Sequence, residues 1–418
     1  MKIAVQKFGG TSVATPELRE KVVERIKETA GEGHRVVAVV SAMGRAGDPY
    51  ATDTLKVLLE NICADVPLRE LDLMMSCGEI ISAGVLVATL WKHGIPSRVM
   101  NGQQAGLVTD GVYSQAQVID CRTDYLLHCL EKGEVPVVAG FQGATSEGEI
   151  NTMGRGGSDT TAVILGAALD ADRVDIFTDV SGIATADPNV FKDARFISRL
   201  SYNEVTQLAY EGARVIHPAA IEVAMKNNVT IAVRNLGDGG SGTIITGTGS
   251  GMGKNYGVDP KQIITGIAHI PGLAQFMVDF TASDADLELE MFEKLGEAGI
   301  SIDLIGVFPL LKVFSVDGEM IGRTERILKK LNLHYSLKKE CAKISVVGAG
   351  MRNIPGVMAR IVKALRQQNI QILQTGDSNI SICLLINGRD LVAAIKTLHD
   401  HFELQKENKI KTPFARVK

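Results

Sequence analysis

The chain has 418 residues, enough for two or three domains of ordinary size. Hydrophobic residues make up 45% and charged residues 22%, values typical of a globular protein with a packed core. The net charge of −4 provides no general basic surface, which argues against binding to nucleic acid or to an acidic membrane. The sequence shows neither a signal-peptide apolar core nor a run of about 18 apolar residues, so a cytoplasmic protein without a membrane span is expected.

Apolar runs of strand length alternate with helical patterns through the first part of the chain. The predicted strands are Ile3–Val5, Val36–Val40, Val135–Ala139, Val174–Phe177 and Val229–Val233. One predicted helix begins near Thr15, and the others cover Ile80–Trp91, Ala116–Glu131, Thr160–Leu169 and Tyr202–Gly212. This alternation predicts an α/β fold, a layered sandwich around a mostly parallel sheet.

The pattern changes after Arg234. Residues 237–257 are rich in Gly, Ser and Thr, and we interpret their start as a last hairpin and the rest as a linker. Beyond them, residues 291–303 resemble residues 361–373, and each segment is the end of a helix that leads into a strand. A repeat of roughly 70 residues predicts two ferredoxin-like βαββαβ modules.

The predicted domain organisation follows from these patterns. The expected parts are a first domain over 1–246, a linker over 247–262, modules over 272–337 and 338–404, and a flexible tail over 405–418. Two strand patterns, Ile263–His269 and Leu273–Phe280, precede the helix of the first module. If the strand within 263–271 serves the second module, then the first module is inserted within the second.

A glycine-rich loop near the N-terminus carries the strongest signal for phosphate chemistry. In Lys7-Phe8-Gly9-Gly10-Thr11-Ser12, a predicted strand delivers a lysine and two glycines to the start of a helix. Glycines let backbone N–H groups approach phosphate oxygens, and the lysine supplies charge for a transferring phosphoryl group. The alternative is a glycine turn capped by a hydroxyl residue, and the pattern alone favours neither.

Three further segments carry weaker signals. Residues 154–161, Gly-Arg-Gly-Gly-Ser-Asp-Thr-Thr, precede a helix, and Arg155 could clamp a carboxylate. Residues 178–188 follow a strand end, where open α/β sheets place ligands, although Asp187-Pro188 is often only a turn. Glu79 could bind an ammonium group, but a glutamate entering a helix usually complements the helix dipole.

Two other patterns do not support a site. Residues 247–254 resemble a P-loop, but Thr248 stands where that motif needs its first glycine. His399 and His401 lie near the end of a helical pattern at a spacing that does not chelate one metal, so both are expected at the surface.

Together, residues 7–12, 154–161, 178–182 and 186–188 and the duplicated C-terminal region resemble the aspartokinase family over nearly the whole chain. The resemblance implies the amino-acid-kinase three-layer sandwich followed by tandem ACT domains. It also implies ATP-dependent phosphorylation of the β-carboxylate of L-aspartate, the first step towards lysine, diaminopimelate, threonine and methionine. Residues 41–53 are most similar to the diaminopimelate-sensitive class. A homo-oligomer joined through the ACT domains, inhibited by diaminopimelate or lysine, is therefore expected.

The resemblance implies roles for individual residues. Lys7 and Asp159 would be catalytic, Lys7 meeting the transferred phosphoryl group and Asp159 holding the basic network in place. Mg²⁺ would arrive on the ATP phosphates, with no metal ligands from the protein. The implied ATP-binding residues are Lys7, Phe8, Gly9, Gly10, Thr178, Asp179, Ala184, Thr185, Ala186, Asp187, Pro188, Asn189 and Arg214. The implied aspartate-binding residues are Ser41, Thr52, Glu79 at the α-ammonium, Arg155 at the α-carboxylate, and Ser158.

The nucleotide side departs from the family pattern at three positions. Ala184, Asn189 and Arg214 stand where the family usually has tyrosine, arginine and lysine. For the effector, the polar turn with Ser283 and Asp284 before a helix of the first module could take a ligand carboxylate on its N–H groups. For these residues alone a simple helix cap is favoured.

Other functions stay open at this point. One is a related kinase acting on glutamate, acetylglutamate, carbamate or a nucleoside monophosphate, which the Gly-Arg-Gly-Gly-Ser-Asp loop disfavours. Another is a non-catalytic amino-acid sensor, which an intact Lys7 and Asp159 disfavour. An NAD-dependent dehydrogenase fails because Asn353 stands where the dinucleotide fingerprint needs its third glycine.

Overall fold

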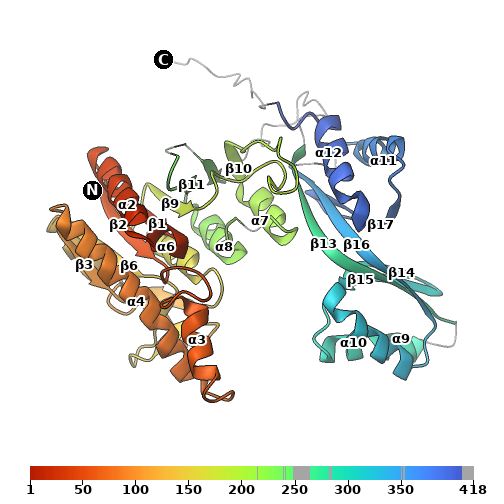
Figure 1. The fold of residues 1–418 in the computed structure, drawn as a ribbon, viewed down its shortest axis with the longest axis horizontal. Coiled ribbons are helices and arrows are strands. Elements are labelled where there is room, and N and C mark those ends of the chain that lie inside the picture. The colour runs from red at the N-terminus through yellow and green to blue at the C-terminus, as the bar shows by residue number, and fades with distance from the viewer. Residues whose placement is uncertain are drawn as a thin grey trace. The chain divides into compact units, whose positions relative to one another are not determined.

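The computed structural model describes residues 1–213, 215–238, 240, 242–247, 264–281, 285–349, 351 and 354–406. These residues form two units, and no sheet is shared between them (Figure 1). The first unit takes most of the chain up to residue 249, and the second takes the remainder. Two internal segments, 184–195 and 210–213, also belong to the second unit, although they fall within the predicted first domain.

An eight-stranded sheet in the order β10-β12-β11-β9-β1-β2-β6-β3 forms the centre of the first unit. All neighbouring strands are parallel except β11 and β12, which form the predicted last hairpin. The continuous apolar runs are explained by burial of the central strands on both faces. The bounds are β1 Ile3–Phe8, β2 Arg35–Val40, β3 Ser97–Met100, β6 Val135–Ala139, β9 Arg173–Thr178, β10 Arg199–Ser201, β11 Ile231–Asn235 and β12 Thr243–Thr246.

Helices cover the sheet of the first unit. Apolar residues of α2 and α4 share a buried cluster with Val36, Ala38 and Val40 of β2. Helix α6 contacts β1 and β9 and packs on α8, so the predicted α/β sandwich is confirmed. The bounds are α1 Gly10–Val13, α2 Pro16–Gly31, α3 Thr52–Glu60, α4 Leu68–Lys92, α5 Asp124–Glu131, α6 Gly157–Ala168, α7 Tyr202–Tyr210 and α8 Pro218–Asn227.

A second, four-stranded sheet in the order β5-β4-β7-β8 contradicts one predicted helix. The prediction of a helix over Ala116–Glu131 is wrong in its first half, because β5 occupies Val118–Cys121 and α5 begins only at Asp124. Pairing with β4 draws this β-branched segment into a strand, an effect that local periodicity does not contain. The other strands are β4 Leu107–Thr109, β7 Gln142–Ala144 and β8 Ile150–Thr152.

Helix α4 is long and carries Glu79, one of the site residues predicted from the sequence. By length and composition it is the one helix within the described parts of the chain that could cross a membrane. However, its buried face carries Asp72, Ser76 and Glu79 as well as apolar residues, and that face packs inside the first unit. A core helix of a globular unit accounts for this composition.

The second unit contains a six-stranded antiparallel sheet in the order β14-β15-β13-β16-β18-β17. Two long strands, β13 (Ile264–Asp279) and β16 (Tyr335–Gly348), run through both halves of this sheet. The other strands are β14 Asp303–Phe308, β15 Leu311–Asp317, β17 Ile372–Asp377 and β18 Ser381–Asn387. The helices are α9 Ala285–Glu297, α10 Ile321–Lys330, α11 Val357–Gln367 and α12 Leu391–His401.

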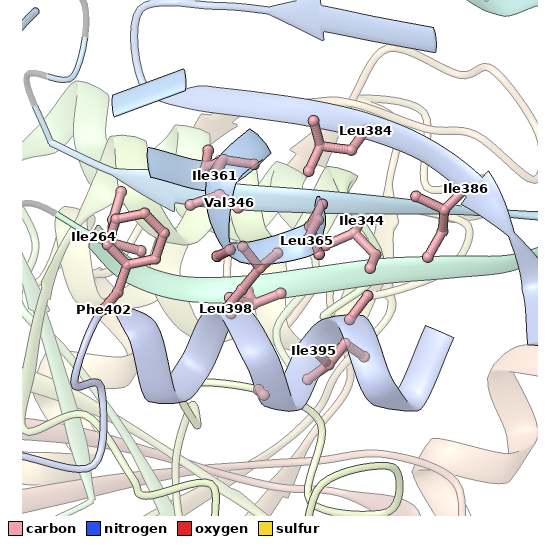
Figure 2. Packing of buried hydrophobic residues seen from close by; sticks show 14 of the residues in the cluster. Ile264, Ile344, Val346, Ile361, Leu365, Leu384, Ile386, Ile395, Leu398 and Phe402 are labelled. Atoms are coloured by element: carbon pink, nitrogen blue, oxygen red, sulfur yellow. The ribbon is translucent and has the colours of Figure 1, made fainter. Parts of the chain in front are cut away.

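The second unit has two main hydrophobic cores, divided along β13. Ile264 in its first half packs with residues of α11, α12, β16 and β18, as Figure 2 shows. Phe276 in its second half packs with residues of α9, α10 and β15. The register with β16 shifts between the halves, near Ile270. This division supports our proposal that the first module is inserted within the second. The proposed linker (247–262) and tail (405–418) fall almost entirely outside the described residues.

The segment 184–195 packs into the second of these modules. Ala186 and Phe191 are buried in the cluster shown in Figure 2. His399 is fully buried and forms a 2.9 Å hydrogen bond between its Nε2 and Thr185 Oγ1, so its predicted surface position is wrong. Burial lowers the pKa of His399, which favours the neutral ring. The partner lies 214 residues away, beyond the reach of any local pattern.

Candidate functional site

A cavity of about 590 Å³ in the first unit opens at the carboxyl ends of β1 and β2. Parallel strands commonly present ligand-binding groups at this edge. Seven of its lining residues were predicted from the sequence: Lys7, Ser41, Thr52, Glu79, Arg155, Ser158 and Asp159. The structure therefore brings both expected catalytic residues and the whole expected aspartate set to one cavity.

The loop after β1 is shaped by close backbone packing. A Cβ atom on Gly10 would lie 2.3 Å from the carbonyl oxygen of Ala42, so only glycine fits there. The N–H of Gly44 donates to the Gly10 carbonyl at 3.1 Å. The Phe8 ring is fully buried and stacks on Phe177 at 5.1 Å between centroids, so it contributes no side-chain contact to a nucleotide.

Lys7 is held in place by an acidic partner. Its Nζ lies 2.7 Å from Oδ1 of Asp159, which sits in the first turn of α6. Both side chains are largely buried, at 12% and 13% exposure, yet both line the cavity. Asp159 thus fixes the position of an ammonium group that a phosphoryl oxygen could share.

Glu79 is the most unusual charged group of the cavity. Its Oε1 accepts hydrogen bonds from the N–H of Ala42 at 3.1 Å and from Thr52 Oγ1 at 3.4 Å. Its Oε2 is buried and has no hydrogen-bond partner among the described residues. Burial raises the pKa of Glu79 to about 8, against smaller opposing effects of these hydrogen bonds. A cationic ligand would supply the missing partner and favour the ionised carboxylate.

Arg155 stands on a loop between two glycines. Gly154 and Gly156 have φ values of +70° and +73°, in the left-handed region. A Cβ on Gly156 would lie 2.2 Å from Cγ of His217, a packing partner that the sequence did not reveal. Arg155 itself is exposed and has no hydrogen bond or ion pair within the described residues. Its guanidinium is available for a carboxylate.

Two predicted nucleotide-binding residues lie at the end of β9, the strand beside β1. Thr178 Oγ1 donates to Asp179 Oδ1 at 3.1 Å. Asp179 also pairs with Arg45 at 3.0 Å, and its carbonyl accepts from Asn235 Nδ2. This exposed polar group borders the same sheet edge as Lys7.

The rest of the predicted nucleotide loop belongs to the second unit. Thr185 and Ala186 are buried there and present no side-chain surface to a nucleotide. Asn189 donates its N–H to Asp187 Oδ1 at 2.8 Å in a local turn. Ala184 is partly buried, and Pro188 and Asn189 are exposed. Three predicted residues lie outside the described part of the chain: Arg214, Ser283 and Asp284.

Several cavity residues were missed in the sequence. Ser114, Phe141 and Thr152 line the cavity beside Arg155, and they come from turns and short strands without a motif. Ser114 has a left-handed φ of +65°, and nothing in its sequence surroundings announces this.

Comparison with known proteins places this chain in a family. The Amino acid kinase family profile matches residues 2–235, and an ACT domain profile matches residues 344–402. Aspartokinase 1 of Bacillus subtilis (strain 168) is 43% identical over 407 residues, covering 97% of this chain and all of the relative. Aspartokinase of Thermus thermophilus is 35% identical over 419 residues, covering 97% of this chain and 100% of the relative.

Solved structures show the same fold. E. coli aspartokinase III in complex with aspartate and ADP (R-state) superposes with a TM-score of 0.72 at 24% identity, covering 96% of this chain and 99% of that one. Aspartate kinase from Synechocystis is 32% identical with a TM-score of 0.53, covering 96% of this chain and 69% of that one.

Proposed function

Since this chain belongs to the aspartokinase family, we propose that the cavity of its first unit is where the β-carboxylate of L-aspartate takes the γ-phosphoryl group of ATP. The chain is a kinase of the amino-acid-kinase fold, with ACT domains for allosteric control. The observation that carries the site assignment is the convergence of Lys7, Glu79 and Arg155 on one cavity. These three groups match a transferring phosphoryl group, an α-ammonium and an α-carboxylate.

The chemistry needs alignment and charge neutralisation rather than a general base. A β-carboxylate has a pKa near ~3.9 in solution and is already an anion at pH 7. The obstacle is bringing this anion to the polyanionic triphosphate. Lys7, held by Asp159 at 2.7 Å, supplies positive charge where the phosphoryl group passes. Mg²⁺ on the ATP phosphates, as substrate complex, supplies the remainder.

Aspartate is recognised at its α-carbon. Arg155 takes the α-carboxylate through its planar fork, with Ser158 beside it. Glu79 takes the α-ammonium on its unpartnered Oε2, while Oε1 stays fixed by Ala42 and Thr52. Ser41 completes the lining at the end of β2. The side chain of aspartate is then directed towards Lys7.

ATP lies along the edge of the sheet formed by β1 and β9. The backbone of Gly9 and Gly10 and the side chains of Lys7, Thr178 and Asp179 are the proposed contacts. Burial removes the side chains of Thr185 and Ala186 from this set. Pro188 and Asn189 are exposed and remain candidates, as does Arg214.

Regulation belongs to the second unit. The proposed effector is diaminopimelate, or else lysine, and the proposed assembly is a homo-oligomer joined through the ACT modules. A cytoplasmic location stays a prediction of the sequence. Inhibition requires the effector to bind the inactive state more tightly, by roughly 1–3 kcal/mol of coupling. Titrating diaminopimelate, lysine and threonine against activity tests the effector, and light scattering at micromolar concentration tests the assembly. Inhibition by none of the three, or a strict monomer, would contradict these two proposals.

The site assignment is tested at Arg155. Arg155→Ala should raise the KM for aspartate by roughly 10²-fold, because a charged, bidentate contact is lost. Arg155→Lys should restore little of this loss, since an ammonium lacks the fork. An ADP-release assay with matched aspartate and glutamate concentrations measures both effects. Better turnover of glutamate, or an unchanged aspartate KM in both variants, would contradict the proposal.

A further inference from the structure

Asp72 is a fully buried carboxylate that sits next to the cavity without lining it. It lies on α4, two helical turns before Glu79, on the same buried face. No lysine, arginine or histidine of the described residues forms an ion pair with it. A buried carboxylate without a cation is costly unless hydrogen bonds replace its hydration. Asp72 therefore needs hydrogen-bond donors from the residues around it.

Four hydrogen bonds from two separate segments satisfy both oxygens of Asp72. Oδ2 accepts the backbone N–H groups of Ser114 and Thr152, each at 2.8 Å. Oδ1 accepts the hydroxyl groups of the same two residues, at 2.8 and 2.9 Å. Each segment thus gives one backbone and one side-chain donor to the carboxylate. Bonds to an ionised acceptor are stronger than neutral ones, so Asp72 joins the two segments firmly.

Both joined segments form the wall of the cavity around Arg155. Ser114 and Thr152 line the cavity, and Thr152 is the last residue of β8, directly before the Arg155 loop. The loop touches the Ser114 turn again, because a Cβ on Gly154 would lie 3.1 Å from the Ser114 carbonyl oxygen. The hydrogen bonds of Asp72 also hold Ser114 at a φ of +65°, which a residue other than glycine adopts only when its surroundings require it.

Arg155 depends on this wall for its position. Its side chain has no hydrogen bond within the described residues, so only the backbone of its loop locates the guanidinium. One side of that loop is fixed through Thr152 and Ser114. We propose that Asp72 is a positioning residue of the aspartate site: it clamps the Ser114 turn to β8 and thereby sets where Arg155 meets the α-carboxylate. This inference rests on the proposed function.

The clamp predicts an effect on one substrate only. Asp72→Asn keeps the side-chain volume, but it places an NH₂ group opposite N–H and O–H groups that are themselves donors. The KM for aspartate should rise roughly tenfold or more, as expected when a binding group is misplaced. The KM for ATP should stay within about twofold of wild type, because no hydrogen bond among the described residues joins Lys7 or Gly10 to Ser114 or Thr152. A purely structural role would lower the thermal midpoint without separating the two substrates.

A double variant and a matched control complete the test. In an Arg155→Ala background, Asp72→Asn should raise the aspartate KM by less than about threefold, because the group it positions is gone. Asp175 is an equally buried aspartate of the same unit that does not line the cavity and pairs with Arg173 and Arg234. Asp175→Asn should lower stability while leaving the aspartate KM within about twofold.

Several outcomes would overturn the clamp. They are an unchanged aspartate KM in Asp72→Asn, an equal rise in both KM values, or the full effect persisting without Arg155. If Asp72→Asn does not fold, Ser114→Ala and Thr152→Val each remove one hydroxyl donor and should raise the aspartate KM roughly threefold. An unchanged KM in both would also overturn it. A wild-type chain that does not turn over aspartate would overturn the proposed function and this inference together, whereas normal wild-type turnover with unchanged variants overturns only the clamp.

Discussion

Two buried ionisable groups, one in each unit, are satisfied in opposite ways. In the first unit, Glu79 faces the cavity with one oxygen lacking a hydrogen-bond partner among the described residues, and burial raises its pKa to about 8. In the second unit, Lys343 on β16 is buried with its ammonium 2.8 Å from Glu211 and also paired with Asp303. Glu211 further accepts from Ser345 Oγ at 2.6 Å. Burial alone would lower the pKa of Lys343, but the bonds to Asp303 and Glu211 outweigh it and raise the pKa.

The contrast shows how a buried charge distinguishes a binding site from a structural contact. A carboxylate with an unused oxygen is costly to bury, and it is tolerated where a ligand completes it. A saturated cluster has no capacity left for a ligand and instead fixes the backbone that carries it. Here that backbone includes the segment 210–213, which follows α7 and packs within the second unit.

The stability of the protein should depend strongly on the saturated cluster of Lys343, Glu211 and Asp303. Lys343→Met leaves Glu211 and Asp303 without their cation and should lower the stability of the second unit by about 3–5 kcal/mol. Denaturant unfolding followed by circular dichroism measures this change. The control is Lys294→Met, which removes an exposed lysine paired with Glu297 at 2.9 Å on α9. A Lys343 variant no less stable than the Lys294 variant would contradict the structural role of the cluster.

Lys7, which is paired with Asp159 in the cavity, should affect the rate of catalysis rather than folding. Lys7→Ala should lower kcat by roughly 10²–10³-fold, the usual loss for one electrostatic stabiliser of a transition state. Lys92 is the matched control, since its ammonium lies 2.8 Å from Glu20 in an exposed pair away from the cavity. Lys92→Ala should keep the wild-type kcat. Equal rates for wild type and Lys7→Ala would remove Lys7 from the mechanism.

The glycine loops show what could be predicted from the sequence. Gly9–Gly10 and Gly154–Gly157 could be found from their residue types and spacing, which are local, although the contacts that require Gly10 and Gly156 come from Ala42 and His217. Lys7 and Arg155 are carried on these loops, so they could be found with them. Helix α6 and strand β6 were likewise predictable, because their apolar patterns are continuous.

What could not be predicted depends on partners distant in sequence. Ser114 and Thr152 are held by Asp72, which lies 42 and 80 residues away from them. His399 was wrongly expected at the surface, because a local pattern does not contain its contact with Thr185. Ala116–Glu131 was wrongly expected as one helix, because β5 forms by pairing with β4. A local pattern contains none of these contacts.

A pH dependence follows from Oε2 of Glu79, which has no hydrogen-bond partner among the described residues. In the free site its pKa of about 8 leaves this carboxyl mostly protonated at pH 7. An α-ammonium needs the ionised form, so binding of aspartate must release a proton below pH 8. Affinity should therefore increase as the pH rises towards 8 and then level off. Below the pKa, the KM for aspartate should fall about tenfold for each pH unit.

Glu79→Gln separates this titration from other causes. The amide keeps the hydrogen bond with the Ala42 N–H but cannot ionise, so the aspartate KM should be high and nearly independent of pH between 6 and 8. The KM for ATP serves as internal control, because no contact of Glu79 with the phosphate loop is expected. A flat wild-type profile together with a raised KM in Glu79→Gln would mean that Glu79 is already ionised in the free enzyme. Glu79 would then not be an unsatisfied buried charge, because polar groups at the cavity would stabilise its carboxylate before the substrate binds. The contrast with the saturated Lys343 cluster would no longer hold.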